Sequence, residues 1–151
     1  MGLENMKQTL FLILIAFISL GCEYDVAERD VPSIVVNALK LGFPNTNDRE
    51  WEKTAEYYIV EFENDADVDY KVKLDGRGNI LMYKYELSKD QLPKTVQDSI
   101  SIRYPNAEID ELEVLYLKRK KYYQIEMEKS FKDLKKVVDL KGQVTEIPYW
   151  D

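Results

Sequence analysis

The residues that could perform catalytic chemistry are few in this chain. Its 151 residues include no histidine and a single cysteine, Cys22. Without histidine, a Ser-His-Asp triad, a Cys-His dyad and a histidine-ligated zinc site are excluded, and one cysteine cannot form a thiolate cluster or an internal disulfide. The sequence therefore predicts a protein that is not an enzyme and that carries no cofactor.

An acidic stretch offers the nearest approach to a metal site. Asp65, Asp67 and Asp69 alternate as at the start of a calcium-binding loop. Such a loop also needs glycine at its sixth position and glutamate at its twelfth, where this chain has Tyr70 and Gly76. We therefore expect a solvated acidic hairpin and no metal.

A pair of glutamates is the remaining catalytic candidate. Glu61 and Glu63 would lie on one face of a strand, within range for acid-base catalysis. No apolar concavity is expected around them to shift a pKa. A small carboxylate enzyme is therefore only the third hypothesis for function.

Cys22 closes an apolar stretch near the start of the chain. Leu10 to Leu20 carries no charge, follows Lys7 and ends just before Gly21. This pattern is typical of a secretion signal and is shorter than the about 20 apolar residues of a spanning helix. It resembles a bacterial lipoprotein signal, in which Cys22 is lipidated and becomes the mature N-terminus. The alternative is a buried structural cysteine after an ordinary signal.

The expected order of segments follows from this signal. Residues 1–21 are predicted to be the signal peptide, and residues 22–30 a solvated tether that is rich in acidic side chains. The lipid at Cys22 would attach the protein to the cell envelope, and we expect the outer membrane.

The rest of the chain repeats itself. Val31-Pro32 precedes Phe43-Pro44-Asn45 at the same spacing as Leu92-Pro93 precedes Tyr104-Pro105-Asn106, with an offset of 61 residues. This predicts two copies of one unit, residues 31–87 and 88–151, that together form one compact body.

Each copy is predicted to begin with a helix and continue with strands. Every fourth residue is apolar in the first part of each copy: Val31, Val35, Leu39 and Phe43, then Leu92, Val96, Ile100 and Tyr104. The later parts alternate between apolar and polar residues, which indicates antiparallel strands. We expect an α+β fold with one helix on about four strands in each copy, including Val144 to Ile147 as the last strand.

At this point the sequence resembles a known family. The lipoprotein signal, the two proline-bounded helices, Trp51, the paired tyrosines and an Asp-x-x-Gly hairpin resemble the PepSY-like, β-lactamase-inhibitor-like proteins of Bacteroidota. The resemblance implies a fold like that of β-lactamase inhibitory protein, with two units side by side and a concave sheet surface. It also implies a binding module that inhibits an envelope enzyme, but no inhibitory residue can be transferred.

The eleven tyrosines are the most unusual part of the composition. Tyr58, Tyr70 and Tyr123 are in phase with core residues and are expected to be buried. The candidate binding surface consists of the tyrosines expected on the opposite face of the sheet: Tyr57, Tyr83, Tyr85, Tyr116 and Tyr122. The alternative is that these are cross-strand pairs on a half-solvated sheet.

Charge supplies a second hypothesis for function. The net charge of -7 argues against nucleic-acid binding. Residues 31–87 carry 7 basic and 11 acidic groups, whereas residues 88–151 carry 12 of each, with a basic run at Lys118 to Lys121. A structural or stress-response lipoprotein acting through charge is therefore the alternative to a monomeric module that binds a protein partner. The basic run also has a simpler explanation, because lysines keep turns soluble and protect edge strands.

The lipoprotein signal can be tested directly. We predict that mass spectrometry of the mature protein finds a lipid-modified Cys22 at the N-terminus, and that Cys22→Ser moves the protein from the membrane fraction to the soluble envelope fraction. An unmodified Cys22, or an N-terminus at another residue, would contradict the assignment.

Overall fold

The computed structural model describes residues 23–130 and 132–151. The expected signal peptide and Cys22 lie outside these described residues. Within them, no helix is long and apolar enough to cross a bilayer.

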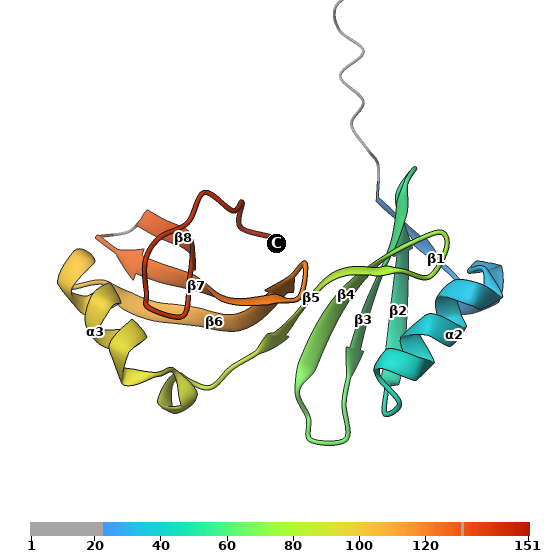
Figure 1. Ribbon diagram of the computed structural model, residues 1–151, viewed down its shortest axis with the longest axis horizontal. Coiled ribbons are helices and arrows are strands. Elements are labelled where there is room, and N and C mark those ends of the chain that lie inside the picture. The colour runs from blue at the N-terminus through green and yellow to red at the C-terminus, as the bar shows by residue number, and fades with distance from the viewer. Residues whose placement is uncertain (1–22, 131) are drawn as a thin grey trace, which may run out of the picture.

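Eight antiparallel strands form one continuous sheet, and their order in space is their order along the chain (Figure 1). The α-helices are α2 (Ser33–Gly42) and α3 (Lys94–Arg103), so the α+β class is confirmed. The strands are β1 (Tyr24–Val26), β2 (Asn47–Lys53), β3 (Tyr57–Glu63), β4 (Asp69–Asp75), β5 (Ile80–Glu86), β6 (Glu108–Leu117), β7 (Lys120–Lys129) and β8 (Lys132–Val138).

The division into four strands per unit was wrong. β5 pairs with β6 from Met82 opposite Leu117 to Glu86 opposite Glu113, so the two halves share one sheet of five and three strands. The expected last strand reduces to a single bridge between Val138 and Val144. Pro148 follows closely, and because proline has no N–H to donate, it cannot extend a ladder.

The segment expected to be a solvated tether is largely ordered. Tyr24–Val26 forms the edge strand β1 against β2, and Glu28–Asp30 forms the 3-10 helix η1. The Glu28 carboxylate accepts hydrogen bonds from Arg49 Nε at 2.6 Å and from Trp51 Nε1 at 3.1 Å. Partial burial acts to raise the pKa of Glu28, but these bonds and the Arg49 charge hold it below its usual range. An acidic residue therefore anchors the segment instead of solvating it.

Both helices begin and end as the proline pattern indicates. Pro32 and Pro93 stand at the N-caps of α2 and α3, where the missing N–H costs nothing, and each follows a 3-10 helix, η1 or η2 (Lys89–Gln91). The helices end just before Phe43 and Tyr104, whose N–H groups still donate to Leu39 and Ile100.

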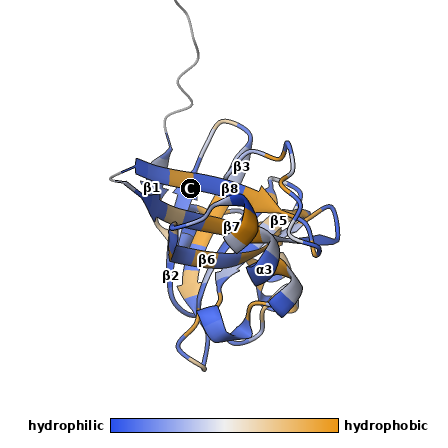
Figure 2. Ribbon diagram, turned by 90° about the vertical axis from the view of Figure 1, so that its left-hand side faces the viewer, coloured by the Kyte–Doolittle hydropathy of each residue, from blue (hydrophilic) through white to orange (hydrophobic). Residues whose placement is uncertain are grey.

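The apolar stripes of the helices form two cores on the same side of the sheet. Val35, Leu39 and Val96 are fully buried, and Ile100 is 4% exposed. Phe43 and Tyr104 are half-buried and pack against the first and second core, respectively. Figure 2 shows that hydrophobic residues concentrate along the strands, whereas the turns are mostly hydrophilic.

One glycine in each half sets the helix against the sheet. In the turns beginning at Asp75 and Asp139, Gly78 and Gly142 have φ angles of 83° and 75°. A Cβ added to Gly78 would lie 2.9 Å from Ile34 O of α2, and one added to Gly142 would lie 2.6 Å from Ser99 Cβ of α3. Both positions therefore require glycine for conformation and for space.

The sheet is strongly curved, with both helices on its outer side and the C-terminus on its inner side (Figure 1). Antiparallel strands twist by roughly 20 to 25° from one to the next, so eight strands accumulate a large rotation. Register shifts that place extra residues in β2, β5 and β6 add to this twist. We call the side opposite the helices the concave face.

The helix placement predicts a contrast in stability. Leu39→Ala and Ile100→Ala should each lower the free energy of unfolding by about 2 to 5 kcal/mol, because each leaves a cavity in a small core. Leu41→Ala and Ile102→Ala are matched controls on the same helices, at side chains that are 86% and 82% exposed, and should change it by less than about 0.5 kcal/mol. Urea denaturation measures the free energy of unfolding of all four variants. Equal losses for Leu39→Ala and Leu41→Ala, or for Ile100→Ala and Ile102→Ala, would refute the packing.

Candidate functional site

The strand register decides which side chains reach the concave face. Residues directly opposite in neighbouring strands share a face. Trp51 opposite Val60, and Val60 opposite Val72, belong to the first core. The residues between them therefore point to the concave face, including Glu52, Glu61 and Lys71.

The expected tyrosine surface does not exist as one patch. Tyr83 lies opposite Val72, and Tyr85 lies opposite Tyr70, which places both on the helix side of the sheet, where Tyr116 joins them opposite Tyr83. The placement of these three on the opposite face was therefore wrong. Of the five candidate tyrosines, only Tyr57 and Tyr122 lie on the concave face, and they are on different halves. β5 has apolar residues on both faces, so its alternation did not reveal which face the helices cover.

The misplaced tyrosines join the two cores. The rings of Tyr83 and Tyr116 stack with their centroids 4.7 Å apart, and those of Tyr70 and Tyr85 stack at 5.0 Å. Burial, with the neighbouring tyrosines, raises the pKa of Tyr85 to about 12. These rings are therefore structural, in agreement with the alternative of cross-strand pairs.

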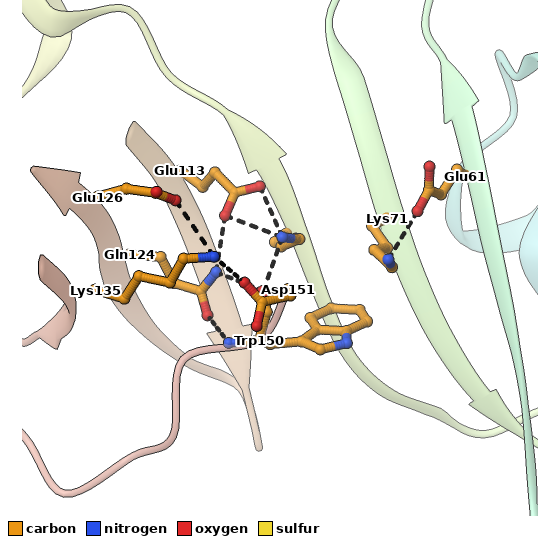
Figure 3. Close-up of polar contacts among 9 residues, drawn as sticks. Glu61, Lys71, Glu113, Gln124, Glu126, Lys135, Trp150 and Asp151 are labelled. Atoms are coloured by element: carbon orange, nitrogen blue, oxygen red, sulfur yellow. Dashed lines mark hydrogen bonds and ion pairs between the residues drawn. The ribbon is translucent and has the colours of Figure 1, made fainter. Parts of the chain in front are cut away.

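A buried polar cluster lies on the concave face where the two halves meet, and nothing in the residue pattern had indicated it. Lys84 of β5 and Glu113 of β6 are each 7% exposed, and Gln124 of β7 is fully buried. Lys84 Nζ lies 3.0 Å from Glu113 Oε1, and Gln124 Nε2 donates to Glu113 Oε2 at 2.7 Å (Figure 3). Polar residues alternating with a core usually indicate a solvated face, so neither the pairing nor the burial was expected.

The C-terminal segment, residues 145–151, covers this cluster. Trp150 O accepts hydrogen bonds from Lys84 Nζ at 2.8 Å and Gln124 Nε2 at 3.0 Å, and Trp150 N donates to Gln124 Oε1 at 2.9 Å. Lys135 pairs with both Asp151 and Glu126 (Figure 3). The part of the chain expected to finish the sheet therefore closes one half of its concave face.

The first half of the concave face is acidic. Partial burial, reinforced by nearby carboxylates, raises the pKa of Glu52 above its usual range. A cleft of about 450 Å³ between the halves has Glu61, Lys71 and Glu111 among its lining residues. On the concave side of β1 to β4, the carboxylates surround only two lysines, Lys71 and Lys73. We use the name acidic face for this set of carboxylates: Asp25, Glu50, Glu52, Glu61, Glu63 and Asp69.

The geometry gives little support to catalysis or metal binding. Glu61 is exposed and forms an ion pair with Lys71 at 2.8 Å. The Asp65 to Asp69 stretch belongs to a turn in which Asn64 accepts hydrogen bonds from the N–H groups of Ala66 and Val68. Among residues 23–130 and 132–151, no group of three potential ligands could hold a metal ion.

Comparison with known families agrees with this architecture. The family described as "Putative beta-lactamase-inhibitor-like, PepSY-like" matches residues 21–82 and again residues 69–146. The chain belongs to this PepSY-like family. The first match runs from before β1 into β5, and the second runs from β4 past β8, so the two overlap at residues 69–82. A search of curated proteins found no match.

Solved structures share the PepSY-like fold of this chain. A BLIP-like protein from Bacteroides fragilis is 23% identical with a TM-score of 0.65, and covers 75% of this chain and 82% of its own. A DUF2874 family protein from Bacteroides uniformis is 19% identical, with a TM-score of 0.68 and coverage of 75% and 85%. A protein from Bacteroides eggerthii described as "putative periplasmic proteins" is 18% identical, with a TM-score of 0.69 and coverage of 76% and 85%. These identities establish the fold alone.

The buried pair predicts a non-additive response to substitution. Lys84→Met or Glu113→Leu alone should lower the free energy of unfolding by about 3 to 5 kcal/mol, because each leaves the other charge buried without its partner. The double variant should lose less than either single variant. Lys71→Met and Glu61→Leu, at a pair whose glutamate is 50% exposed, should each cost less than about 1 kcal/mol. A double-mutant cycle by urea denaturation measures the coupling, and additive losses at Lys84 and Glu113 would contradict it.

Proposed function

We propose that this PepSY-like protein is a non-catalytic binding module of the bacterial cell envelope that holds a protein partner through its concave face. The observation that carries the proposal is the acidic face. Its members Asp25, Glu50, Glu61 and Asp69 are exposed, whereas the helix side of the same strands is filled by the first core.

The charge of this face defines the chemistry of the partner. Carboxylates outnumber lysines on it, and partial burial, together with the neighbouring carboxylates, raises the pKa of Glu52 in spite of the opposing charge of Lys71. A partner surface rich in lysine and arginine would supply the missing positive charge and would be drawn in from a distance. The partner in this proposal is therefore a basic protein surface.

The location proposed for the module is the envelope, through a lipid at Cys22. The apolar stretch before Cys22 supports this, as does the description of the Bacteroides eggerthii protein with the same fold. β1, whose first residue Tyr24 stands two positions after Cys22, is the edge strand beside the acidic face. Inhibition of an envelope enzyme is the narrowest form of the proposal and follows from the family resemblance only.

Capture of a partner from envelope extract tests the proposal. We expect a stoichiometric protein partner at low salt, and at least tenfold weaker binding by the Glu50→Lys/Glu61→Lys variant, because the reversed charges would repel a basic surface. The matched control is Asp90→Lys/Asp98→Lys, which makes the same charge change at exposed positions around α3.

The control separates this proposal from the charge-based alternative. Equal weakening by both variants would mean that net charge, and not the acidic face, governs association. Absence of any partner for the unsubstituted protein would refute the binding function. A structural lipoprotein acting through its charge would show only salt-sensitive association, and reversed charges would weaken it equally wherever they lie on the surface.

A further inference from the structure

The main chain of the C-terminal segment is bonded to the sheet at fewer positions than the paired strands beneath it are to one another. After Thr145, whose N–H donates to Val137 O at 2.9 Å, the next main-chain bonds to the sheet are those of Trp150. The segment has no regular secondary structure, and none of its residues is fully buried. Such a segment can detach locally while the sheet remains folded.

The sheet recognises this segment through its main chain. Both polar atoms of the Gln124 amide bind the same residue, with Oε1 accepting from Trp150 N and Nε2 donating to Trp150 O. Lys84 Nζ adds a second donor to that carbonyl. The three cluster residues come from three neighbouring strands, whose register brings them together without the segment, and they are at least nine-tenths buried when the segment is docked. Main-chain recognition of this kind accepts any extended peptide, and the flanking side chains must supply selectivity.

The flanking contacts favour an aromatic residue followed by an acidic one. The indole of Trp150 lies among three ammonium groups, with Lys73 Nζ at 5.5 Å, Lys84 Nζ at 5.6 Å and Lys71 Nζ at 5.9 Å from its ring. Ammonium groups at such distances are attracted to the face of an aromatic ring. Asp151 pairs with Lys135. Trp150 therefore reaches from the polar cluster to lysines of the first half.

The resident segment is an imperfect occupant. The Tyr149 hydroxyl is buried and has no hydrogen-bond partner among the described residues. A buried hydroxyl without a partner loses its bonds to water and weakens the docked state. A segment without this hydroxyl would fit the same place better.

We propose that the site formed by Lys84, Glu113 and Gln124 is a peptide-binding site, that residues 145–151 are its built-in occupant, and that a partner's extended segment with an aromatic residue followed by an acidic one replaces them. This inference rests on the proposed binding function and names a second element of the same concave face. The partner would place its basic surface on the acidic face and its aromatic-acidic segment in the site.

Competition between the resident segment and a free copy of it tests the site without any partner. The probe is a fluorescent peptide with the sequence of residues 145–151, and fluorescence polarisation reports its binding to the full chain. The Trp150→Pro variant removes both the indole and the N–H that binds Gln124, so its own segment should undock. We expect it to bind the peptide at least tenfold more tightly than the unsubstituted protein, whose tethered segment competes at an effective concentration of about millimolar.

Peptide variants supply controls that do not depend on refolding the protein. A peptide carrying Trp150→Pro should bind at least tenfold more weakly, and one carrying Tyr149→Phe should bind more tightly. The inference would be overturned if the Trp150→Pro protein failed to bind the unsubstituted peptide at about 1 mM. It would also be overturned if the peptide carrying Trp150→Pro bound as tightly as the unsubstituted peptide. Binding of the free peptide with no partner in the capture experiment would refute the proposed function while leaving the site intact.

Nuclear magnetic resonance gives a second measurement should the variant fail to fold. The unsubstituted protein has two indole N–H signals, from Trp51 and Trp150. Excess unlabelled peptide should shift the Trp150 signal toward its exposed value and leave that of Trp51, which is bonded to Glu28, unchanged. A fixed Trp150 signal would show a permanent structural segment, and a concentration-dependent dimer with exchanged segments would show that a second copy of the chain is the occupant. Either outcome overturns the inference.

Discussion

The pairing of β5 with β6 is the interaction on which the rest of this structure depends. It joins a five-stranded half to a three-stranded half and fixes their register over Met82 to Glu86. On the helix side it brings Tyr83 onto Tyr116, which connects the two cores. On the concave side it brings Lys84 to Glu113. One ladder of backbone hydrogen bonds therefore creates both the aromatic contact between the halves and the polar cluster opposite to it.

The two faces of the sheet have different compositions because successive side chains of a strand point to opposite faces. The helices cover the apolar residues of the outer side, whereas the concave face carries most of the carboxylates, lysines and amides of the sheet together with a few buried apolar residues such as Ile59 and Leu115. Where a charged pair on this face is also buried, another segment must complete its hydrogen bonds. The main chain at Trp150 does so for Lys84 and Gln124. The C-terminal segment is thus explained by the polar residues beneath it.

Much of the fold could be predicted from the sequence because its signals are local. Prolines at a fixed spacing mark the helix starts, and the four-residue apolar period marks the faces that Leu39 and Ile100 bury. The count of strands could not be predicted, because β1 has only three residues and contains the charged Asp25. A segment of this kind becomes a strand through its partner β2, and not through its own composition.

The candidate site was harder to predict than the fold, since it depends on contacts between distant residues. Lys84, Glu113 and Gln124 are separated by up to 40 positions and meet only after the strands are in register. The phase of β5 was ambiguous because Met82 and Tyr83 are both hydrophobic, and that ambiguity misplaced the two tyrosines of this strand, Tyr83 and Tyr85. A shift of one residue in phase moves every side chain of a strand to the other face.

The sequential order of the strands also has a consequence for how the molecule is made. Every strand pairs with the strand that precedes it in the chain, so a chain synthesised from its N-terminus can add each new strand to an edge that is already formed. Residues 145–151 follow β8, so their binding place is formed entirely by strands that precede them in the chain. In a chain that folds in this order, the polar side chains of Lys84, Glu113 and Gln124 remain open to solvent and to other molecules until residues 145–151 dock.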